Sequence, residues 1–264
     1  GKEMELILNP SFSPANGFHA GGWYPSASCQ VRFISKKIQY DHVPSKKDFS
    51  MKHPHICYIV CALPQSHAFA PNPGDLVIAA DGGYAQLGGV HADLVVGDFD
   101  SLGFVPAGEH VVRHPAEKDD TDTMLAARIG LERGYRAFVL LGGVGGRLDH
   151  TLANIQTLAF LRENGARAAL LGEAETITLI QNESLRFRAG LAGIVSVFSF
   201  GAVASGVYER GLAYALTDAT LTDTNPLGVS NAFTGAAAEI SVQNGRLVVL
   251  YAGLPEDSDL FSSH

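Results

Sequence analysis

The sequence predicts an α/β protein in which a parallel sheet with helices is followed by a smaller all-β domain. From residue 55 onward, short apolar runs alternate with helical patterns, which is typical of βα units. The runs are apolar throughout rather than at every second position, and this favours a parallel sheet covered on both faces. From about residue 176, short strand patterns follow one another with no helical pattern between them. They predict a second domain that is sandwich-like or barrel-like.

The first 52 residues differ from the rest of the chain. Six of the seven lysines lie there, and the segment shows no sustained periodicity. Turn-forming pairs such as Asn9-Pro10 interrupt it. We interpret residues 1–52 as an atypical N-terminal extension, in which the run 30–34 could add an edge strand.

Residues 53–172 form the predicted α/β domain. Gly134 and Gly165 stand where a glycine commonly ends a helix, so they mark the ends of the two longer helices, near 121–133 and 148–164. A short helix is expected after Gly83. The predicted strands are 56–61, 76–80, 94–97, 110–113, 138–141 and 168–171.

Residues 173–254 form the predicted β domain. Its strand candidates are 177–180, 185–187, 194–198, 237–242 and 247–251. The pair Asn244-Gly245 between the last two predicts a β-hairpin. The polar residues 255–264 are predicted to be a frayed tail.

Bulk properties narrow the class of protein. Hydrophobic residues make up 46% of the 264 positions and the formal net charge is -8, as in a globular acidic protein. That charge argues against binding to nucleic acid or to an anionic membrane, although a divalent metal can still bridge the protein to a polyanion. The three cysteines include no CxxC pair, which favours a reduced, cytoplasmic setting. No apolar segment is long enough to span a bilayer, and no signal sequence is expected.

The segment Gly97-Asp98-Phe99-Asp100-Ser101 follows a buried strand and is the leading candidate for the chemistry. In extended structure Asp98 and Asp100 leave the same face, about 7 Å apart along the backbone. Two such carboxylates can share Mg²⁺, which prefers oxygen ligands. Gly97 leaves room for a ligand's phosphates, and Ser101 can donate a hydrogen bond. The alternative is an ordinary solvated turn.

Asp81 begins a second motif, Asp-Gly-Gly, at the end of another predicted strand. Its glycines allow backbone N–H groups to approach an anion, and Asp81 can bind substrate or a metal-bound water. The alternative is a turn in which Asp81 caps the short helix.

A third acidic motif, residues 117–122, precedes the first long helix. Asp119 and Asp122 lie three residues apart and share a face at the helix start. Lys118 is the one lysine after residue 52, and a compact ammonium there suggests a phosphate contact. The structural alternative is helix capping by acidic residues.

Residues 142–150 form a glycine-rich loop between a predicted strand and a helix. Such a loop can hold phosphate on its N–H groups, with Arg147 adding a planar fork. It matches neither the P-loop pattern nor the dinucleotide fingerprint. The alternative is a tight turn capped by Asp149, with His150 packed beside it.

Taken together, the ordered motifs resemble the thiamine pyrophosphokinase (thiamine diphosphokinase) family. The resemblance covers about residues 55–253. It rests on the motifs DGG at 81–83, GDFDS at 97–101, EKDDTD at 117–122, GGRLDH at 145–150 followed by Asn154, GLAY at 211–214 and GVSN at 228–231.

The resemblance implies a homodimer that transfers a pyrophosphoryl group from ATP to thiamine with Mg²⁺, leaving AMP. It also implies roles for particular residues. Asp98, Asp100 and Asp122 would be the metal and catalytic carboxylates, with Asp81 a further catalytic group beside them. The ATP and phosphate contacts would come from Ser101, Lys118, Asp119, Thr121, Arg147, Asp149, His150 and Asn154. Thiamine would be held by Tyr214, Ser230 and Asn231.

Several alternatives stay open at this point. Either Asp122 or Asp81 can accept the proton of the thiamine hydroxyl. A metal-dependent phosphohydrolase could use the same carboxylates with water as acceptor, and a non-catalytic nucleotide or thiamine sensor could keep the pocket. Tyr214 could instead be a strand aromatic that covers the core.

Overall fold

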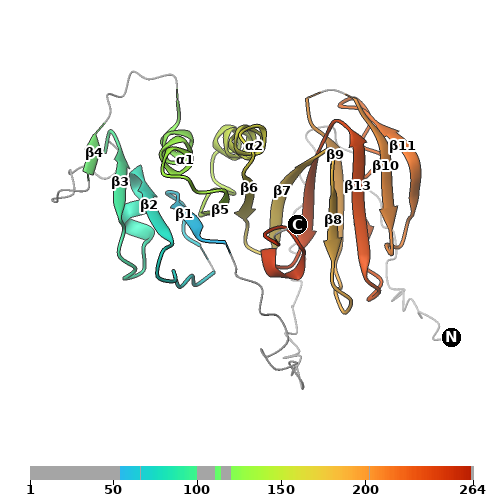
Figure 1. The fold of residues 1–264 in the computed structure, drawn as a ribbon, viewed down its shortest axis with the longest axis horizontal. Coiled ribbons are helices and arrows are strands. Elements are labelled where there is room, and N and C mark those ends of the chain that lie inside the picture. Colours follow the sequence, from blue (N-terminus) through green and yellow to red (C-terminus); the bar gives the residue numbers. More distant parts are fainter. Residues whose placement is uncertain (1–53, 66, 100–110, 114–119, 202, 263–264) are drawn as a thin grey trace, which may run out of the picture. The chain divides into compact units, whose positions relative to one another are not determined.

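The computed structural model describes residues 54–65, 67–99, 111–113, 120–201 and 203–262 (Figure 1). The predicted N-terminal extension, with its possible edge strand at 30–34, lies outside the described residues. The same is true of Asp100, Ser101, Lys118 and Asp119.

A ten-stranded sheet runs through the described chain, and six of its strands are parallel. All six strands predicted for the α/β domain are confirmed. Their order is β4-β3-β2-β1-β5-β6, so the chain works outward from β1 to β4 and then returns to place β5 on the other side of β1. Their bounds are β1 Ile56–Val60, β2 Leu76–Ala80, β3 Leu94–Gly97, β4 Val111–Arg113, β5 Ala137–Leu141 and β6 Arg167–Leu171.

Burial on both faces explains why the sequence of these strands is apolar without interruption. Along β1, Tyr58 and Val60 belong to one hydrophobic cluster, whereas Cys57 and Ile59 belong to another on the opposite face. The helices α1 (Asp122–Glu132) and α2 (Leu148–Glu163) cover the second face and lie on the same side of the sheet in Figure 1. Neither is long and apolar enough to cross a membrane.

The ends of both helices follow the predicted signals. The Thr121 hydroxyl accepts a hydrogen bond from the Met124 N–H and so caps α1. Gly134 and Gly165 follow α1 and α2 with φ of 89° and 74°, a left-handed conformation that glycine adopts most easily. The short helix expected after Gly83 is a 3-10 helix, η1, which already begins at Asp81 and ends at Gln86.

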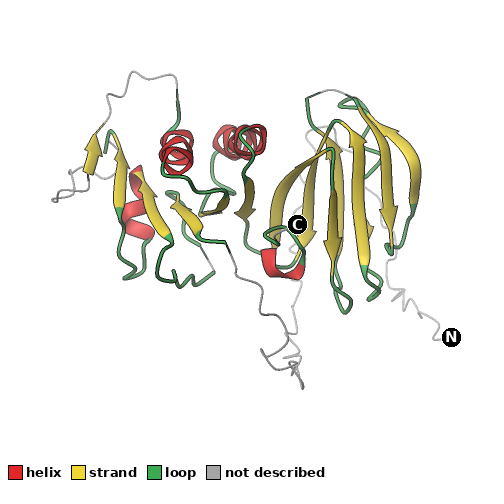
Figure 2. Ribbon diagram, viewed as in Figure 1, coloured by secondary structure: helices red, strands yellow, loops and turns green. Residues whose placement is uncertain are grey.

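The antiparallel strands continue the same sheet and add a second one (Figure 2). Next to β6 lie β7 (Glu175–Gln181), β14 (Arg246–Ala252), β9 (Ile194–Ser199) and β12 (Asn231–Ala232). The second sheet has the order β11-β10-β13-β8. Its strands are β8 Ser184–Phe187, β10 Ala204–Arg210, β11 Leu216–Leu221 and β13 Ala238–Asn244.

Inward side chains of both sheets join one core. Val197 and Val249 of the ten-stranded sheet belong to the same buried cluster as Val207 and Ile240 of the four-stranded sheet. That cluster extends along the parallel strands to Val60 and Val139. The α/β and all-β parts therefore share a sheet and a core.

Three of the β-strands were not predicted from the sequence. In β11 the residues are largely polar and exposed, and β12 has only two residues. Gly206, with φ of 63°, and shifts of register interrupt β10. None of the three carries the sustained apolar pattern that marks the other strands.

The predicted hairpin at Asn244-Gly245 is wrong. β13 pairs with β10 and β8, whereas β14 pairs with β7 and β9, so the turn passes from one sheet to the other. Asn182, which follows β7, stabilises the turn, because the Gly245 N–H donates to its side-chain oxygen at 2.9 Å. A tight turn signal predicts reversal of the chain but not the pairing partner of the two strands.

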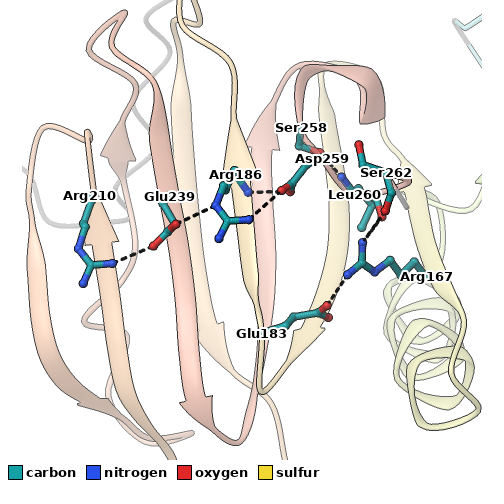
Figure 3. Close-up of polar contacts among 9 residues, drawn as sticks. All are labelled: Arg167, Glu183, Arg186, Arg210, Glu239, Ser258, Asp259, Leu260 and Ser262. Carbon is teal, nitrogen blue, oxygen red and sulfur yellow. Dashed lines mark hydrogen bonds and ion pairs between the residues drawn. The ribbon is translucent and has the colours of Figure 1, made fainter. Parts of the chain in front are cut away.

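The prediction that the tail after Leu254 is frayed is wrong for residues 255–262. Leu260 is buried, and Asp259 accepts the main-chain N–H of Arg186 at 2.8 Å. Figure 3 shows how alternating charges of the four-stranded sheet, Arg210, Glu239 and Arg186, lead to this segment. Long-range contacts, which no local pattern reveals, therefore order it.

Candidate functional site

Three carboxylates meet at the carboxyl ends of the parallel strands. Asp81 follows β2, Asp98 follows β3, and Asp122 is the first residue of α1. One ligand oxygen from each lies within 4.8 Å of the others. Neighbouring parallel strands end at the same edge of a sheet, which is where α/β proteins bind ligands.

Close backbone contacts bring these carboxylates together. A Cβ atom on Gly97 would lie 3.1 Å from Cα of Asp81, so the end of β3 packs directly against the start of η1. Gly83 is tighter still, since a Cβ there would lie 1.8 Å from the carbonyl oxygen of Val60. In the Asp-Gly-Gly motif, Gly83 is thus required by packing against β1.

The donor set fits a hard divalent cation. Asp81 is only 8% exposed, and its Oδ1 atom is buried with no hydrogen-bond partner. An unpartnered buried carboxylate oxygen is costly unless a cation or a proton accompanies it. Carboxylate oxygens from three elements, each within 4.8 Å of the others, are ligands that Mg²⁺ accepts.

The described part of the Gly-Asp-Phe-Asp-Ser motif departs from an extended strand. β3 ends at Gly97, and Phe99 is buried with φ of 65°, in the left-handed region. The extended geometry from which Asp98 and Asp100 were predicted to share a face therefore does not continue through Phe99. Asp98 joins the cluster, while Asp100 lies outside the described residues.

The glycine-rich loop is shaped by the helix that follows it. The buried Asn154 of α2 donates from Nδ2 to the carbonyl oxygen of Gly143 at 2.8 Å. The N–H of Gly145 donates to the Thr151 hydroxyl at 3.2 Å. Gly142, with φ of 65°, leaves no room for a side chain, because a Cβ would lie 2.2 Å from the carbonyl oxygen of Leu63. The loop is thus held from α2 and from the segment after β1.

The exposed start of α2 carries a charge pair. Arg147 contacts Asp149 at 2.6 Å, and His150 donates its main-chain N–H to the same carboxylate at 3.0 Å. The Arg147 guanidinium lowers the pKa of the Asp149 carboxyl, while Asp149 raises the pKa of Arg147. Both groups are therefore charged and solvent-accessible beside the loop.

A cavity of about 350 Å³ opens at the same edge of the sheet. It is lined by residues 64, 65 and 67 after β1, by 141, 142 and 144 at and after the end of β5, and by 171–173 at and after the end of β6. This is the point where the strand order reverses, between β1 and β5, and such switch points bind ligands in open α/β sheets. Sequence analysis missed Gln65, His67 and Glu173, because the strand order that brings them together is a tertiary property.

The predicted thiamine residues come from the connection between β10 and β11 and from the start of β12. Tyr214 is 71% exposed in the connection from β10 to β11, so the alternative that it covers the core is wrong. Ser230 is exposed with φ of 62°, and its N–H donates to the Ser196 hydroxyl at 3.0 Å. Asn231, by contrast, is buried, and its amide contacts the main chain of Tyr214.

The comparisons with known proteins agree with this arrangement. The model of the thiamin pyrophosphokinase catalytic domain matches residues 72–170, and that of the thiamin pyrophosphokinase vitamin B1 binding domain matches residues 181–247. The chain belongs to the thiamine pyrophosphokinase family. It is a thiamine diphosphokinase, which transfers a pyrophosphoryl group from ATP to thiamine.

Solved structures of the family share the fold. A thiamine pyrophosphokinase from Bacillus subtilis is 23% identical with a TM-score of 0.65, over 75% of this chain and 98% of that one. A thiamin pyrophosphokinase family protein from Enterococcus faecalis is 25% identical with a TM-score of 0.64, over 76% and 99%. The yeast enzyme is 16% identical with a TM-score of 0.59, over 77% and 88%. No curated protein sequence matches the chain.

Proposed function

We propose that Asp81, Asp98 and Asp122, together with Asp100, form the Mg²⁺ centre with which this thiamine diphosphokinase acts. The convergence of three carboxylates within 4.8 Å is the observation that carries the proposal. A bound Mg²⁺ would neutralise charge on the phosphates and orient them for in-line attack. A carboxylate of the cluster, Asp81 or Asp122, accepts the proton of the thiamine hydroxyl.

ATP would extend from this cluster to the cavity at the switch point. The end of β1 and the residues after it connect the carboxylate cluster with the cavity. Val60 contacts Gly83 of η1, and Leu63 contacts Gly142 of the glycine-rich loop. The cavity is large enough for the nucleoside, and the phosphates would reach the carboxylates. Arg147 supplies a fixed positive charge for them, and Lys118 a second.

The remaining nucleotide-side residues divide into two groups. Asn154 and Thr121 would act through the backbone, since Asn154 holds the glycine-rich loop and Thr121 caps the helix that presents Asp122. Asp149 and His150, beside Arg147, would orient the guanidinium toward phosphate. Ser101 and Asp119 are proposed as direct contacts.

Thiamine would bind against the exposed ring of Tyr214, with the Ser230 hydroxyl reading the nitrogen edge of the pyrimidine. An aromatic face suits a flat ring, and a hydrogen-bonding edge discriminates strongly between analogues. Asn231 would act by holding the main chain of Tyr214, because its amide already bonds there.

We further propose a homodimer in which each thiamine pocket faces the catalytic part of the partner subunit. Ile194 and Phe198 of β9 are 61% and 39% exposed on one face of the sheet, and Val229 nearby in sequence to Ser230 is 41% exposed. Exposed apolar side chains beside a binding site are typical of an interface. The buried free thiols of Cys57 and Cys61 suit a reducing, cytoplasmic location.

The finer domain description is also a proposal. The β part, residues 173–254, would form a sandwich of the four-stranded sheet on the antiparallel half of the ten-stranded sheet, since their inward side chains share a core. Residues 53–172 would form the catalytic domain, residues 1–52 an extension, and residues 255–264 the C-terminal segment.

The metal proposal is tested with ATP, thiamine and Mg²⁺ by following thiamine diphosphate and AMP. Asp98→Asn and Asp122→Asn are each expected to lower kcat at least 100-fold, because a metal clamp contributes several kcal/mol to the transition state. Asp120→Asn is the matched control, since Asp120 pairs with Arg128 at 2.7 Å rather than with the cluster. Near-normal turnover of both cluster variants at saturating Mg²⁺ would refute the assignment, and release of inorganic phosphate without AMP would favour hydrolysis.

A further inference from the structure

Glu209 is a fully buried acid in the four-stranded sheet, outside the carboxylate cluster. Its side chain is 0% exposed on β10, where Val207 of the same strand faces the shared core. Its Oε2 atom accepts a hydrogen bond from Asn231 Nδ2 at 2.5 Å, while Oε1 is buried with no hydrogen-bond partner. A polar group so placed costs stability, so its position calls for a physical explanation.

The partner of Glu209 is the residue that shapes the loop around Tyr214. Asn231 Oδ1 accepts the N–H of Tyr214 at 2.9 Å, and Asn231 Nδ2 donates to the carbonyl oxygen of Tyr214 at 2.6 Å. The Asn231 side-chain amide thus makes the pair of hydrogen bonds with Tyr214 that the main chain of a neighbouring strand would make. A main-chain bond from Ala213 N–H to the carbonyl oxygen of Ala232 at 2.9 Å extends the pairing.

The contact also joins the two sheets. Glu209 lies on β10 of the four-stranded sheet, and Asn231 lies on β12 at the edge of the ten-stranded sheet. Ser230 precedes Asn231, so the same anchor lies next to the residue whose hydroxyl is proposed to read the pyrimidine. One buried acceptor therefore sets the relative position of two segments that come from different sheets.

We propose that Glu209 is a positioning residue for thiamine binding, which acts by holding Asn231 and through it the main chain at Tyr214 and Ser230. This inference rests on the proposed thiamine pocket at Tyr214 and Ser230. Without the acceptor at Oε2, the Asn231 amide loses its one side-chain hydrogen-bond partner among the described residues and is held by main-chain contacts alone, so both pocket residues gain freedom. Thiamine then binds more weakly, while ATP, bound at the parallel strands, is unaffected.

The test compares steady-state constants of the full-length chain, with thiamine and ATP varied in turn. Glu209→Leu removes the acceptor and places an apolar side chain of similar size in an apolar interior, so it should remain folded. We expect it to raise the thiamine KM about 10-fold or more and to leave the ATP KM within about twofold. This pattern indicates that thiamine binding alone is weakened. Glu209→Gln keeps an oxygen that can accept from Asn231, and it should restore the thiamine KM to within about threefold of the parent.

Two further variants make the outcome decisive. Val207→Ala is the matched packing control, because Val207 is equally buried on the same strand but is not bonded to Asn231, so its thiamine KM should not change. A rise with Val207→Ala equal to that with Glu209→Leu, or no rise with folded Glu209→Leu, overturns the inference. Tyr214→Ala tests the pocket itself. If Tyr214→Ala raises the thiamine KM while Glu209→Leu does not, the role of Glu209 is refuted but the thiamine pocket is supported. If Tyr214→Ala leaves the thiamine KM unchanged, the proposed thiamine pocket itself is refuted.

Discussion

At the scale of single residues, the site depends on polar side chains that the fold takes out of water. Asp81, Asn154, Glu209 and Asn231 are all buried. The side-chain amides of Asn154 and Asn231 both donate hydrogen bonds to main-chain carbonyl oxygens, and Asn231 donates to Glu209 as well, so both residues are parts of the scaffold. Asp81 and Glu209 each keep one oxygen without a hydrogen-bond partner, and the two differ in their surroundings. Asp81 lies among other carboxylates and suits a cation, whereas Glu209 lies in an apolar core and suits a proton.

The raised pKa of Glu209 leads to a prediction about how the free energy of unfolding depends on pH. Burial raises the pKa of Glu209, and the hydrogen bond from Asn231 opposes this rise only in part. Because the folded-state pKa is raised, the native state holds the proton more tightly than the unfolded chain does. The stabilisation from the neutral acid is complete below the unfolded pKa, near pH 4, and is lost as pH rises through the folded pKa.

Glu209→Gln cannot ionise at this position, so its free energy of unfolding relative to the parent should rise as the pH increases above the unfolded pKa of glutamate, about 4.3. The gain amounts to about 1.4 kcal/mol for each unit by which the pKa is raised. Urea unfolding of both proteins across this range measures it. Val207→Ala is the control, since Val207 is buried on the same strand and has no ionisable group, so it should show no such gain. A difference between Glu209→Gln and the parent that stays constant with pH would mean that Glu209 does not titrate in this range.

At the scale of elements, ion pairs hold the turn between β7 and β8 to the α/β part. Glu183 accepts from Arg162 of α2 at 2.7 Å and from Arg167 of β6 at 2.8 Å. All three side chains are largely buried, so the pairs are poorly screened by water. Figure 3 shows that Arg167 also reaches the C-terminal segment, through the carbonyl oxygens of Leu260 and Ser262.

Removing the charge of Glu183 should therefore loosen several elements at once. We expect Glu183→Gln to lower the free energy of unfolding by about 1–3 kcal/mol, as for hydrogen bonds to charged groups. Glu163→Gln removes a comparable contact to Arg246, but Glu163 is 55% exposed, and it should cost less than about 1 kcal/mol. Urea unfolding gives both values, and equal losses would show that burial of the Glu183 pairs adds nothing.

At the scale of the whole molecule, the ten-stranded sheet carries the carboxylate cluster at one place and borders the proposed thiamine residues at another. The proposed metal-binding carboxylates lie at the ends of its parallel strands, and the proposed thiamine residues lie near its β9-β12 edge. Ile194 and Phe198 leave an apolar face of β9 exposed at that edge. A second copy of the chain would cover such a face and bring the two kinds of site together.

The proposed dimer leads to a prediction that links assembly with activity. Phe198→Asp places a charge in the proposed interface, and we expect a monomer at micromolar concentration with at least 10-fold lower kcat/KM for thiamine. Light scattering after gel filtration and steady-state kinetics measure the two effects. Val203→Asp is the control, because Val203 is 56% exposed but lies outside β9, and it should leave both unchanged. A fully active Phe198→Asp monomer would contradict a pocket shared between subunits.

Local sequence patterns predict the secondary-structure elements, and the ordered motifs indicate the reaction. The six parallel strands, both long helices and their terminal glycines follow from apolar runs, helical periods and backbone freedom, which act over a few residues. The acidic motifs were also local, since each directly follows a strand or opens a helix, and their order along the chain resembles one family.

Tertiary structure decided what those elements face. After β13 the chain can either return to pair with β13 or pass to another sheet, and the choice depends on partners far away in the sequence. For this reason Asn244-Gly245 wrongly predicted a hairpin. The cavity at β1 and β5, the ordered segment after Leu254 and the bond from Glu209 to Asn231 likewise need the complete strand order. In the sequence, Glu209 beside Arg210 is typical of an ordinary surface charge. Its burial is not visible there, because burial depends on the strand's place in the sheet and on the core packed against it.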